Sequence, residues 1–170
     1  MTRFFPPLLL ALCGGCAILS GCAADMRIFA ATKEANDMQA KLAVLPPQCT
    51  LGNTTDAGGT WISAPQIVGA LGFVVPGLFT FNGPVRTDAF RVALNSAALQ
   101  NLEKVETRDA QGNWSVAWTG GRSAPPTGCD VVKLAQTFAS GRREITEMRL
   151  IIHPVFGKVM FANVGVRQAG

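Results

Sequence analysis

The chain of 170 residues contains no tyrosine, a single histidine and few charged side chains, which make up 15% of the residues. A single histidine argues against the common His-rich metal sites and weakens every catalytic scheme that depends on histidine. The low charge content, beside 48% hydrophobic residues, excludes a disordered, acidic or collagen-like protein. A net charge of +4 spread through the chain gives no nucleic-acid-binding footprint. The length suits one domain of ordinary size.

Familiar catalytic motifs are also missing from the sequence. It has no nucleophile elbow, no Gly-rich phosphate loop and no His-Glu-x-x-His. His153 stands at the end of an apolar segment, which is more typical of a structural histidine than of a general base. Glu103 and Glu106, like Glu144 and Glu147, are three residues apart, so in a strand their side chains point to opposite faces and read as solvated charges. We therefore predict no catalytic residues, no metal site and no cofactor.

The N-terminal segment has the pattern of an export signal. Arg3 precedes an apolar run at residues 8–19, which is followed by the small residues Ser20 and Gly21. The run is much shorter than the roughly 20 residues that a membrane-spanning helix needs. We expect residues 1–21 to be a cleaved signal peptide.

The end of this segment, Leu19-Ser20-Gly21-Cys22, resembles the lipobox of bacterial lipoproteins. In that family the Cys thiol receives a diacylglycerol, the peptide is cut just before it, and the new amine is acylated. The resemblance implies that Cys22 is lipidated and becomes the first residue of the mature chain, held firmly to the membrane by several acyl chains. The alternative is a plain secretory signal with a chance cysteine.

The residue after this cysteine bears on localisation. In diderm bacteria the family's inner-membrane retention signal is an Asp there, and this chain has Ala23. The resemblance therefore implies a lipid-anchored protein of the cell envelope, on the outer membrane facing the periplasm in a diderm. In a monoderm the protein would lie on the outer face of its membrane.

Two of the five cysteines remain once the signal and the lipid are accounted for. Cys13 and Cys16 lie in the signal and Cys22 is consumed by lipid, which leaves Cys49 and Cys129. In a compartment that permits disulfides we favour a bridge between them. It would close a loop of about 80 residues and contribute about 4 kcal/mol in the chain-entropy model. Two free thiols, or pairing with another chain, are the alternatives.

Composition divides the mature chain at about residue 48. Residues 24–43 are rich in Ala, Lys, Glu, Gln and Met and contain no Gly or Pro, before Pro46-Pro47. We interpret residues 22–48 as the lipid anchor and a partly helical tether. A partner-binding helix is the alternative.

Residues 49–170 have the texture of an all-β domain, with short apolar runs separated by Gly, Pro, Asn and Asp. Apolar and polar residues alternate in several of these runs, as expected for strands with one buried face. We predict an antiparallel β-sandwich or jelly roll of about eight strands. The candidate strands are residues 60–68, 73–81, 85–95, 99–108, 113–119, 130–139, 143–153 and 159–167.

Two local features refine this assignment. The sequence Asp109-Ala-Gln-Gly112 supplies the glycine that a tight hairpin with a bulge requires. Residues 96–101 contain good helix formers, and Asn95-Ser96 could cap a turn of helix there. We leave residues 96–101 open between strand and helix.

Residues 99–120 resemble a recurring piece of galactose-binding-like (discoidin-type) β-sandwiches. In these domains a strand leads through a Gly-containing turn to a Trp-x-x-x-Trp strand and a Gly, as in this chain. The resemblance covers residues 85–167 and rests on soft motifs. It implies binding of sugars, polysaccharides, lipid head groups or protein partners through loops at one end of the sandwich, and gives a class of function rather than a ligand.

Four residues are candidates for ligand contact. Trp61 follows a Gly-Gly loop and is the best candidate for an exposed aromatic side chain. Arg122, Arg142 and Arg143 lie near expected turns, where they could contact an acidic polymer or lipid head groups.

Other apolar residues favour the core. Trp114 and Trp118 invite a sugar-stacking interpretation, but the face they share with Val116 favours burial. Residues 69–81 form an unusually apolar run that suggests two buried strands joined by a turn. An exposed patch that docks on a membrane or partner is the alternative.

Together these observations predict a lipid-anchored envelope lipoprotein with a non-catalytic binding β-sandwich. Its partners would be the membrane, through the lipid on Cys22, and a glycan or another envelope ligand. The alternative is a structural or assembly subunit of an envelope secretion or transport complex, which would use the apolar surface of the domain.

Overall fold

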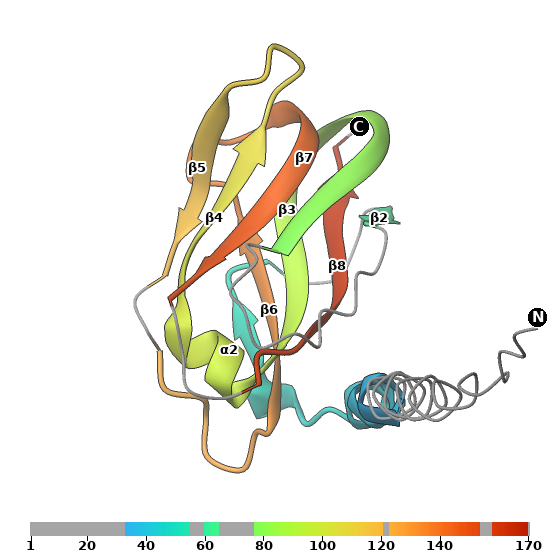
Figure 1. The fold of residues 1–170 in the computed structure, drawn as a ribbon, viewed down its shortest axis with the longest axis vertical. Coiled ribbons are helices and arrows are strands. Elements are labelled where there is room, and N and C mark those ends of the chain that lie inside the picture. The colour runs from blue at the N-terminus through green and yellow to red at the C-terminus, as the bar shows by residue number, and fades with distance from the viewer. Residues whose placement is uncertain (1–32, 55–59, 65–76, 121–122, 154–157, 170) are drawn as a thin grey trace, which may run out of the picture. The chain divides into compact units, whose positions relative to one another are not determined.

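The computed structural model describes residues 33–54, 60–64, 77–120, 123–153 and 158–169 (Figure 1). The expected signal, Cys22, Arg122 and most of the apolar run at residues 69–81 lie outside these ranges. A helix at residues 33–43 and a short 3-10 turn, η1 (Pro47–Cys49), precede the strands. The strands and one further helix are β1 (Thr50–Gly52), β2 (Trp61–Ser63), β3 (Gly77–Asn95), α2 (Ser96–Asn101), β4 (Leu102–Arg108), β5 (Trp114–Thr119), β6 (Val131–Thr137), β7 (Arg143–Ile152) and β8 (Phe161–Gln168).

The predicted all-β class is confirmed, with eight strands in a single curled sheet. The order β1-β6-β3-β7-β4-β5 forms its main path, and β8 pairs with both β3 and β2. The sheet is mixed rather than purely antiparallel, because β1 pairs with β6 in parallel. The other pairings among the described strands are antiparallel.

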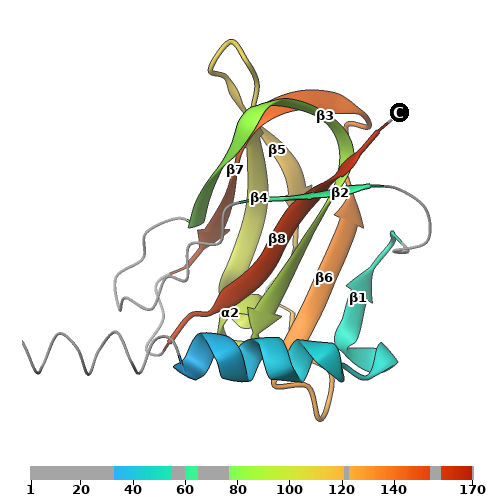
Figure 2. The ribbon, with the colours of Figure 1, turned by 90° about the vertical axis from the view of Figure 1, so that its right-hand side faces the viewer.

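The long strand β3 joins the two halves of this sheet (Figures 1 and 2). Its residues 77–87 pair with β7, β7 pairs with β4, and β4 pairs with β5. We name these four strand segments the first half. Its residues 87–95 pair with β8 on one side and β6 on the other, and β1 and β2 complete the second half. Separate strands were expected at residues 73–81 and 85–95, but the described part of this segment, from Gly77 to Asn95, forms the single strand β3. The chain passes through residues 82–84 as an irregularity in the pairing with β7, aided by a positive φ of 134° at Gly83.

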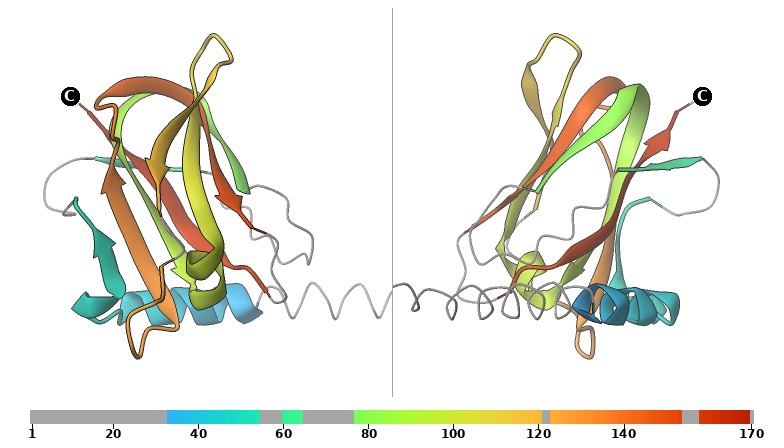
Figure 3. Two further views of the ribbon diagram at one scale, coloured as in Figure 1. Left: turned by 90° about the vertical axis from the view of Figure 1, so that its left-hand side faces the viewer. Right: turned by 45° about the vertical axis from the view of Figure 1, so that its right-hand side comes forward.

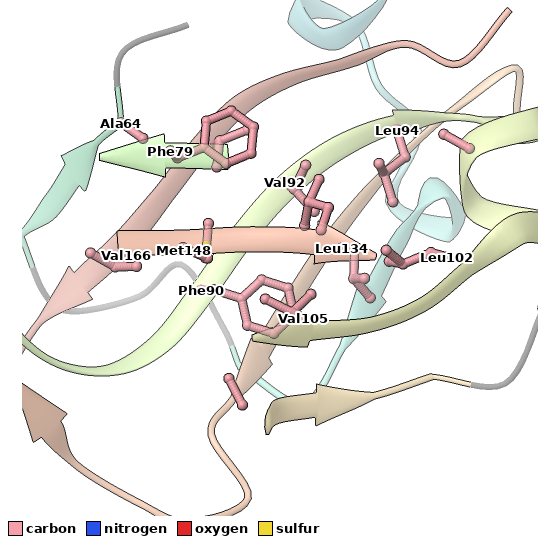
Figure 4. Close-up of a cluster of buried hydrophobic side chains, with 14 of the residues drawn as sticks. Ala64, Phe79, Phe90, Val92, Leu94, Leu102, Val105, Leu134, Met148 and Val166 are labelled. Atoms are coloured by element: carbon pink, nitrogen blue, oxygen red, sulfur yellow. The ribbon is translucent and has the colours of Figure 1, made fainter. Parts of the chain in front are cut away.

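One hydrophobic core lies between the two halves (Figure 4). Alternate residues of each strand point into it, as the period of two requires. Among the largest fully buried side chains are Phe79, Phe90, Val92, Leu94, Leu102, Val105, Ile145, Met148, Leu150 and Val166.

The helix at residues 33–43 covers part of the outer face of the second half (Figure 2). Met38, only 4% exposed, packs with Ala93 of β3, Val131 of β6 and Ala162 of β8. Lys41 Nζ also lies 2.8 Å from Asp130 Oδ2. The compact unit that holds the sheet runs from Ala35 to Gly170, so it includes most of this helix.

A disulfide joins Cys49 at the end of η1 to Cys129 before β6, with Cα atoms 5.6 Å apart. Both cysteines are buried in the main core. The bridge ties the segment that follows the helix to the strand with which β1 pairs.

The two local turn predictions also meet the structure. Residues 96–101 form a helix, and the Asn95 side chain accepts a hydrogen bond from Ala98 N at 3.1 Å. The hairpin between β4 and β5 closes through Asp109 N and Gly112 N, which bond to the Asn113 and Asp109 carbonyls, with φ of 89° at Gly112. The hairpin prediction is confirmed. Residues 96–101, which the sequence left open, are helical, so the candidate strand at residues 99–108 begins only at Leu102.

Candidate binding surface

The outer face of the first half carries two cross-strand rows of side chains. The register aligns Leu78 of β3, Arg149 of β7, Glu106 of β4 and Val116 of β5 in one row. It aligns Thr80, Glu147, Arg108 and Trp114 in the next row. We name these eight residues, with Lys104, the Trp114 face; Figure 3 shows β7 and the β4–β5 pair side by side.

Opposite charges pair across the strands of this face. Arg149 Nε lies 2.6 Å from Glu106 Oε2, and Lys104 Nζ lies 2.8 Å from the other carboxylate oxygen. Burial of the Glu106 carboxyl, whose side chain is 9% exposed, would raise its pKa. The hydrogen bonds from Lys104 and Arg149 outweigh this effect, so the pKa of Glu106 is lowered from its ordinary 4.5. Arg108 Nη1 pairs with Glu147 Oε2 at 3.2 Å.

Trp114 is held in place by two of these arginines. The guanidinium of Arg149 lies 4.0 Å from the centre of the Trp114 ring, and that of Arg108 lies 5.8 Å from it. Both distances are within the range of cation–π attraction. Because both arginines are fixed by carboxylates, the half-buried Trp114 ring is oriented before any ligand arrives.

Apolar side chains flank the charged centre of the face. Leu78 is 42% exposed and Val116 is 46% exposed. The other large hydrophobic residue exposed in the described parts of the chain is Val44. The face therefore combines an oriented tryptophan, fixed arginines and exposed aliphatic groups, a composition that is typical of recognition surfaces.

The expected shared face of Trp114, Val116 and Trp118 was wrong. The β4–β5 register shifts between Val105 and Glu106, so Val105 pairs with Trp118 while Glu106 pairs with Val116. Ala117 is the extra residue, and its carbonyl accepts a hydrogen bond from Ala139 N at 3.2 Å. The bulge sends Trp118 toward the core, where its ring lies 6.0 Å from that of Phe90, and leaves Trp114 and Val116 outside.

Trp61, the aromatic residue singled out from the sequence, lies on β2 in the second half. It is half-buried, and the Arg91 guanidinium lies 4.7 Å from its ring centre. Trp61 Nε1 and Arg91 Nε are both buried and find no acceptor among the described residues. Trp61 is therefore not fully exposed, and in burial and in its arginine neighbour it resembles Trp114; the two tryptophans differ in that Trp61 lies on β2 in the second half.

The predicted arginines have different surroundings. Arg143 opens β7 and is half-buried, whereas Arg142, beside it in the turn, is exposed. Arg122 lies outside the described residues. The structure does not bring Trp61 and Arg143 together, since they lie on strands of different halves.

The single histidine forms a surface pair. His153 Nε2 lies 2.9 Å from Glu103 Oε2, and both side chains are more than a third exposed. Across the described ranges, no group of three or more His, Cys, Asp or Glu side chains is arranged to hold a metal ion.

The chain was compared with protein-family models and with curated proteins. No protein-family model matches the chain, and no curated protein matches it. Within the parts of the chain that the structure describes, no helix is both long and apolar enough to cross a membrane.

Proposed function

We propose that the protein is a lipid-anchored envelope lipoprotein whose β-domain binds an envelope glycan on the Trp114 face without catalysing a reaction. The observation that carries this proposal is the Trp114 ring oriented by Arg108 and Arg149 on a sheet face where, among the described residues, Leu78 and Val116 are exposed. The anchor rests on the likeness of Leu19-Ser20-Gly21-Cys22 to a lipobox.

A glycan suits the chemistry of this face. An indole ring packs well against the apolar face of a sugar ring. Around it, the side chains of Lys104, Arg108 and Glu147 offer donors and acceptors for hydroxyl groups. Because these groups are already held by one another, binding costs little side-chain entropy.

A protein partner is the second candidate, favoured by the exposure of Leu78 and Val116. Exposed aliphatic groups beside tryptophan and arginine are common at protein interfaces. In this case the protein would be a structural or assembly subunit of an envelope complex, and Leu78 would contribute more to binding than Trp114.

The test compares two tryptophan variants in binding to purified peptidoglycan and to a glycan array. Trp114→Leu should lower retention about fivefold or more, since an aromatic anchor of a binding surface contributes more than about 1 kcal/mol. Trp61→Leu is the matched control on the second half and should bind like the wild type once its folding is verified. If only Trp61→Leu lost glycan binding, the binding site would have to be assigned to β2 instead of the Trp114 face. Absence of glycan binding in the wild type, with co-purification of membrane proteins, would contradict the proposal in favour of the assembly subunit.

The anchor has a separate test, radioactive palmitate labelling in a bacterial host. The wild-type chain should incorporate label and fractionate with the membrane. Cys22→Ser should lose the label, because the thiol is the acceptor of the diacylglycerol in the resembled family. Unchanged labelling in Cys22→Ser would remove the anchor from the account.

A further inference from the structure

Arg143 lies at the end of the domain formed by the β4–β5 hairpin and the turn before β7. It is the first residue of β7 and pairs with Thr87 of β3. Its Nη1 donates hydrogen bonds to Thr107 Oγ1, at 3.1 Å, and to Ser115 Oγ. The guanidinium lies 5.3 Å from the ring centre of Phe138, which is buried. Two hydroxyl groups and one ring therefore fix the plane of this cation.

The charge of Arg143 is not neutralised within the described part of the chain, where no carboxylate lies within ion-pair distance of it. Three other arginines contrast with it: Arg108 pairs with Glu147, Arg149 with Glu106 and Arg167 with Asp88. Burial lowers the pKa of the Arg143 guanidinium from its ordinary value. A guanidinium nevertheless remains protonated at neutral pH. Arg143 is therefore a half-buried positive charge with no carboxylate beside it among the described residues.

The nitrogen atoms that Arg143 leaves unused have a particular geometry. Both of its hydrogen bonds to hydroxyl groups use Nη1. Nε and Nη2 share one edge of the planar guanidinium, with two N–H bonds that point in nearly the same direction. This edge matches the two oxygens of a carboxylate and forms the bidentate pairs that make arginine selective for such groups.

We propose that Arg143 is a carboxylate-binding subsite, at which Nε and Nη2 hold the carboxylate of an acidic sugar. The inference rests on the proposed function in taking the ligand to be an envelope glycan. It deepens that function by adding a second contact: Thr107 and Ser115 alternate with the residues of the Trp114 face, so Arg143 would hold an acidic sugar of the same glycan on the other side of the β4–β5 pair.

The anionic group bound by Arg143 could belong to a glycan or to a lipid head group. The position of Arg143 favours the glycan. In Figure 2 the β4–β5 hairpin lies at one end of the sheet and the helix at residues 33–43 at the other. The expected tether enters the domain through that helix. Arg143 therefore lies at the end of the sheet opposite to this helix, which the expected anchor precedes in the sequence.

The experiment is an NMR titration of the folded domain with sodium glucuronate, observed at the Arg143 Nε–Hε signal. Methyl glucoside, inorganic phosphate and phosphatidylglycerol vesicles are the comparison probes. We expect saturable shifts with glucuronate, weaker shifts with phosphate and none with the neutral glucoside. Stronger binding of phosphate or of the vesicles would overturn the assignment to a carboxylate.

Two variants test whether carboxylate binding needs the Nε–Nη2 edge of Arg143 or only its positive charge. Arg143→Lys keeps the charge and loses the two-pronged edge, and should weaken glucuronate binding about tenfold, while Arg143→Gln should abolish it. Arg86→Gln, at an exposed arginine on the neighbouring strand β3, is the control and should bind like the wild type. Wild-type affinity in folded Arg143→Gln would overturn the inference. If that variant still binds peptidoglycan through Trp114, the proposed function survives without the subsite.

Discussion

The two halves of the sheet share strand β3 but bury it differently. In residues 77–81 buried and exposed side chains alternate strictly. In residues 89–94 nearly every side chain is buried: Phe90, Val92 and Leu94 lie in the main core, and Ala93 on the outer face packs with Met38 of the helix at residues 33–43. A covered face tolerates small apolar residues such as Ala93, whereas an uncovered face requires polar groups. The first half is therefore the side on which the described chain leaves a broad face open to a ligand.

The largest loss of stability is expected at Phe90, which is fully buried in the second part of β3. Phe90→Ala should lower the free energy of unfolding by about 3–5 kcal/mol, since it removes contacts with Trp118 and Phe138 and leaves a cavity. Urea denaturation measures this change. Leu78→Ala, in the first part of the same strand, is the control and should cost less than about 1 kcal/mol. Equal losses in the two variants would contradict the burial of Phe90 in the core and the exposure of Leu78 on the outer face.

Loss of the disulfide should have the next largest effect. The double variant Cys49→Ala/Cys129→Ala frees a loop of 80 residues and should lower the free energy of unfolding by about 2–4 kcal/mol. Reduction of the wild-type protein should produce a similar loss, and reduction of the double variant should produce none. A double variant as stable as the oxidised wild type would show that the bridge adds nothing to stability.

Met38 tests whether the helix truly covers the second half. Met38→Ala should destabilise the domain by about 2 kcal/mol and raise amide hydrogen exchange in residues 35–43. Glycan binding should not change, because Met38 lies far from the Trp114 face. A variant with native stability and native exchange would mean that the helix only tethers the domain.

Glu106 should have the smallest effect and a distinct pH dependence. Because the folded-state pKa of Glu106 is lowered, its contribution to stability is full above the unfolded-state pKa, near 4.5. It is lost as the pH falls through the folded-state value. At pH 7 Glu106→Gln should be about 1 kcal/mol less stable than the wild type, and the two should converge in acid. A difference that stays constant between pH 7 and pH 3 would contradict this assignment.

The sequence predicted the all-β class, most strands after residue 85 and the hairpin at residues 109–112, because alternation and turn glycines are local signals. It left residues 96–101 open between strand and helix, and they are helical. It did not predict strand β1, whose three residues gain their structure from pairing with β6. The Trp114 face was also missed, although Lys104, Glu106 and Arg108 alternate in sign and Glu147 and Arg149 do so on another strand. That pattern becomes a surface only once the cross-strand register is known, and the bulge at Ala117 that exposes Trp114 depends on a contact with Ala139.

The central claim, that the uncovered face of the first half binds a glycan, is tested most directly by residue-resolved mapping. Amide NMR spectra of the folded domain would be followed during titration with soluble peptidoglycan fragments. The account predicts that the shifted signals cluster in residues 78–80, 104–108, 114–116 and 147–151. Shifts centred on β6, β8 and the helix at residues 33–43, or no shifts at all, would contradict it.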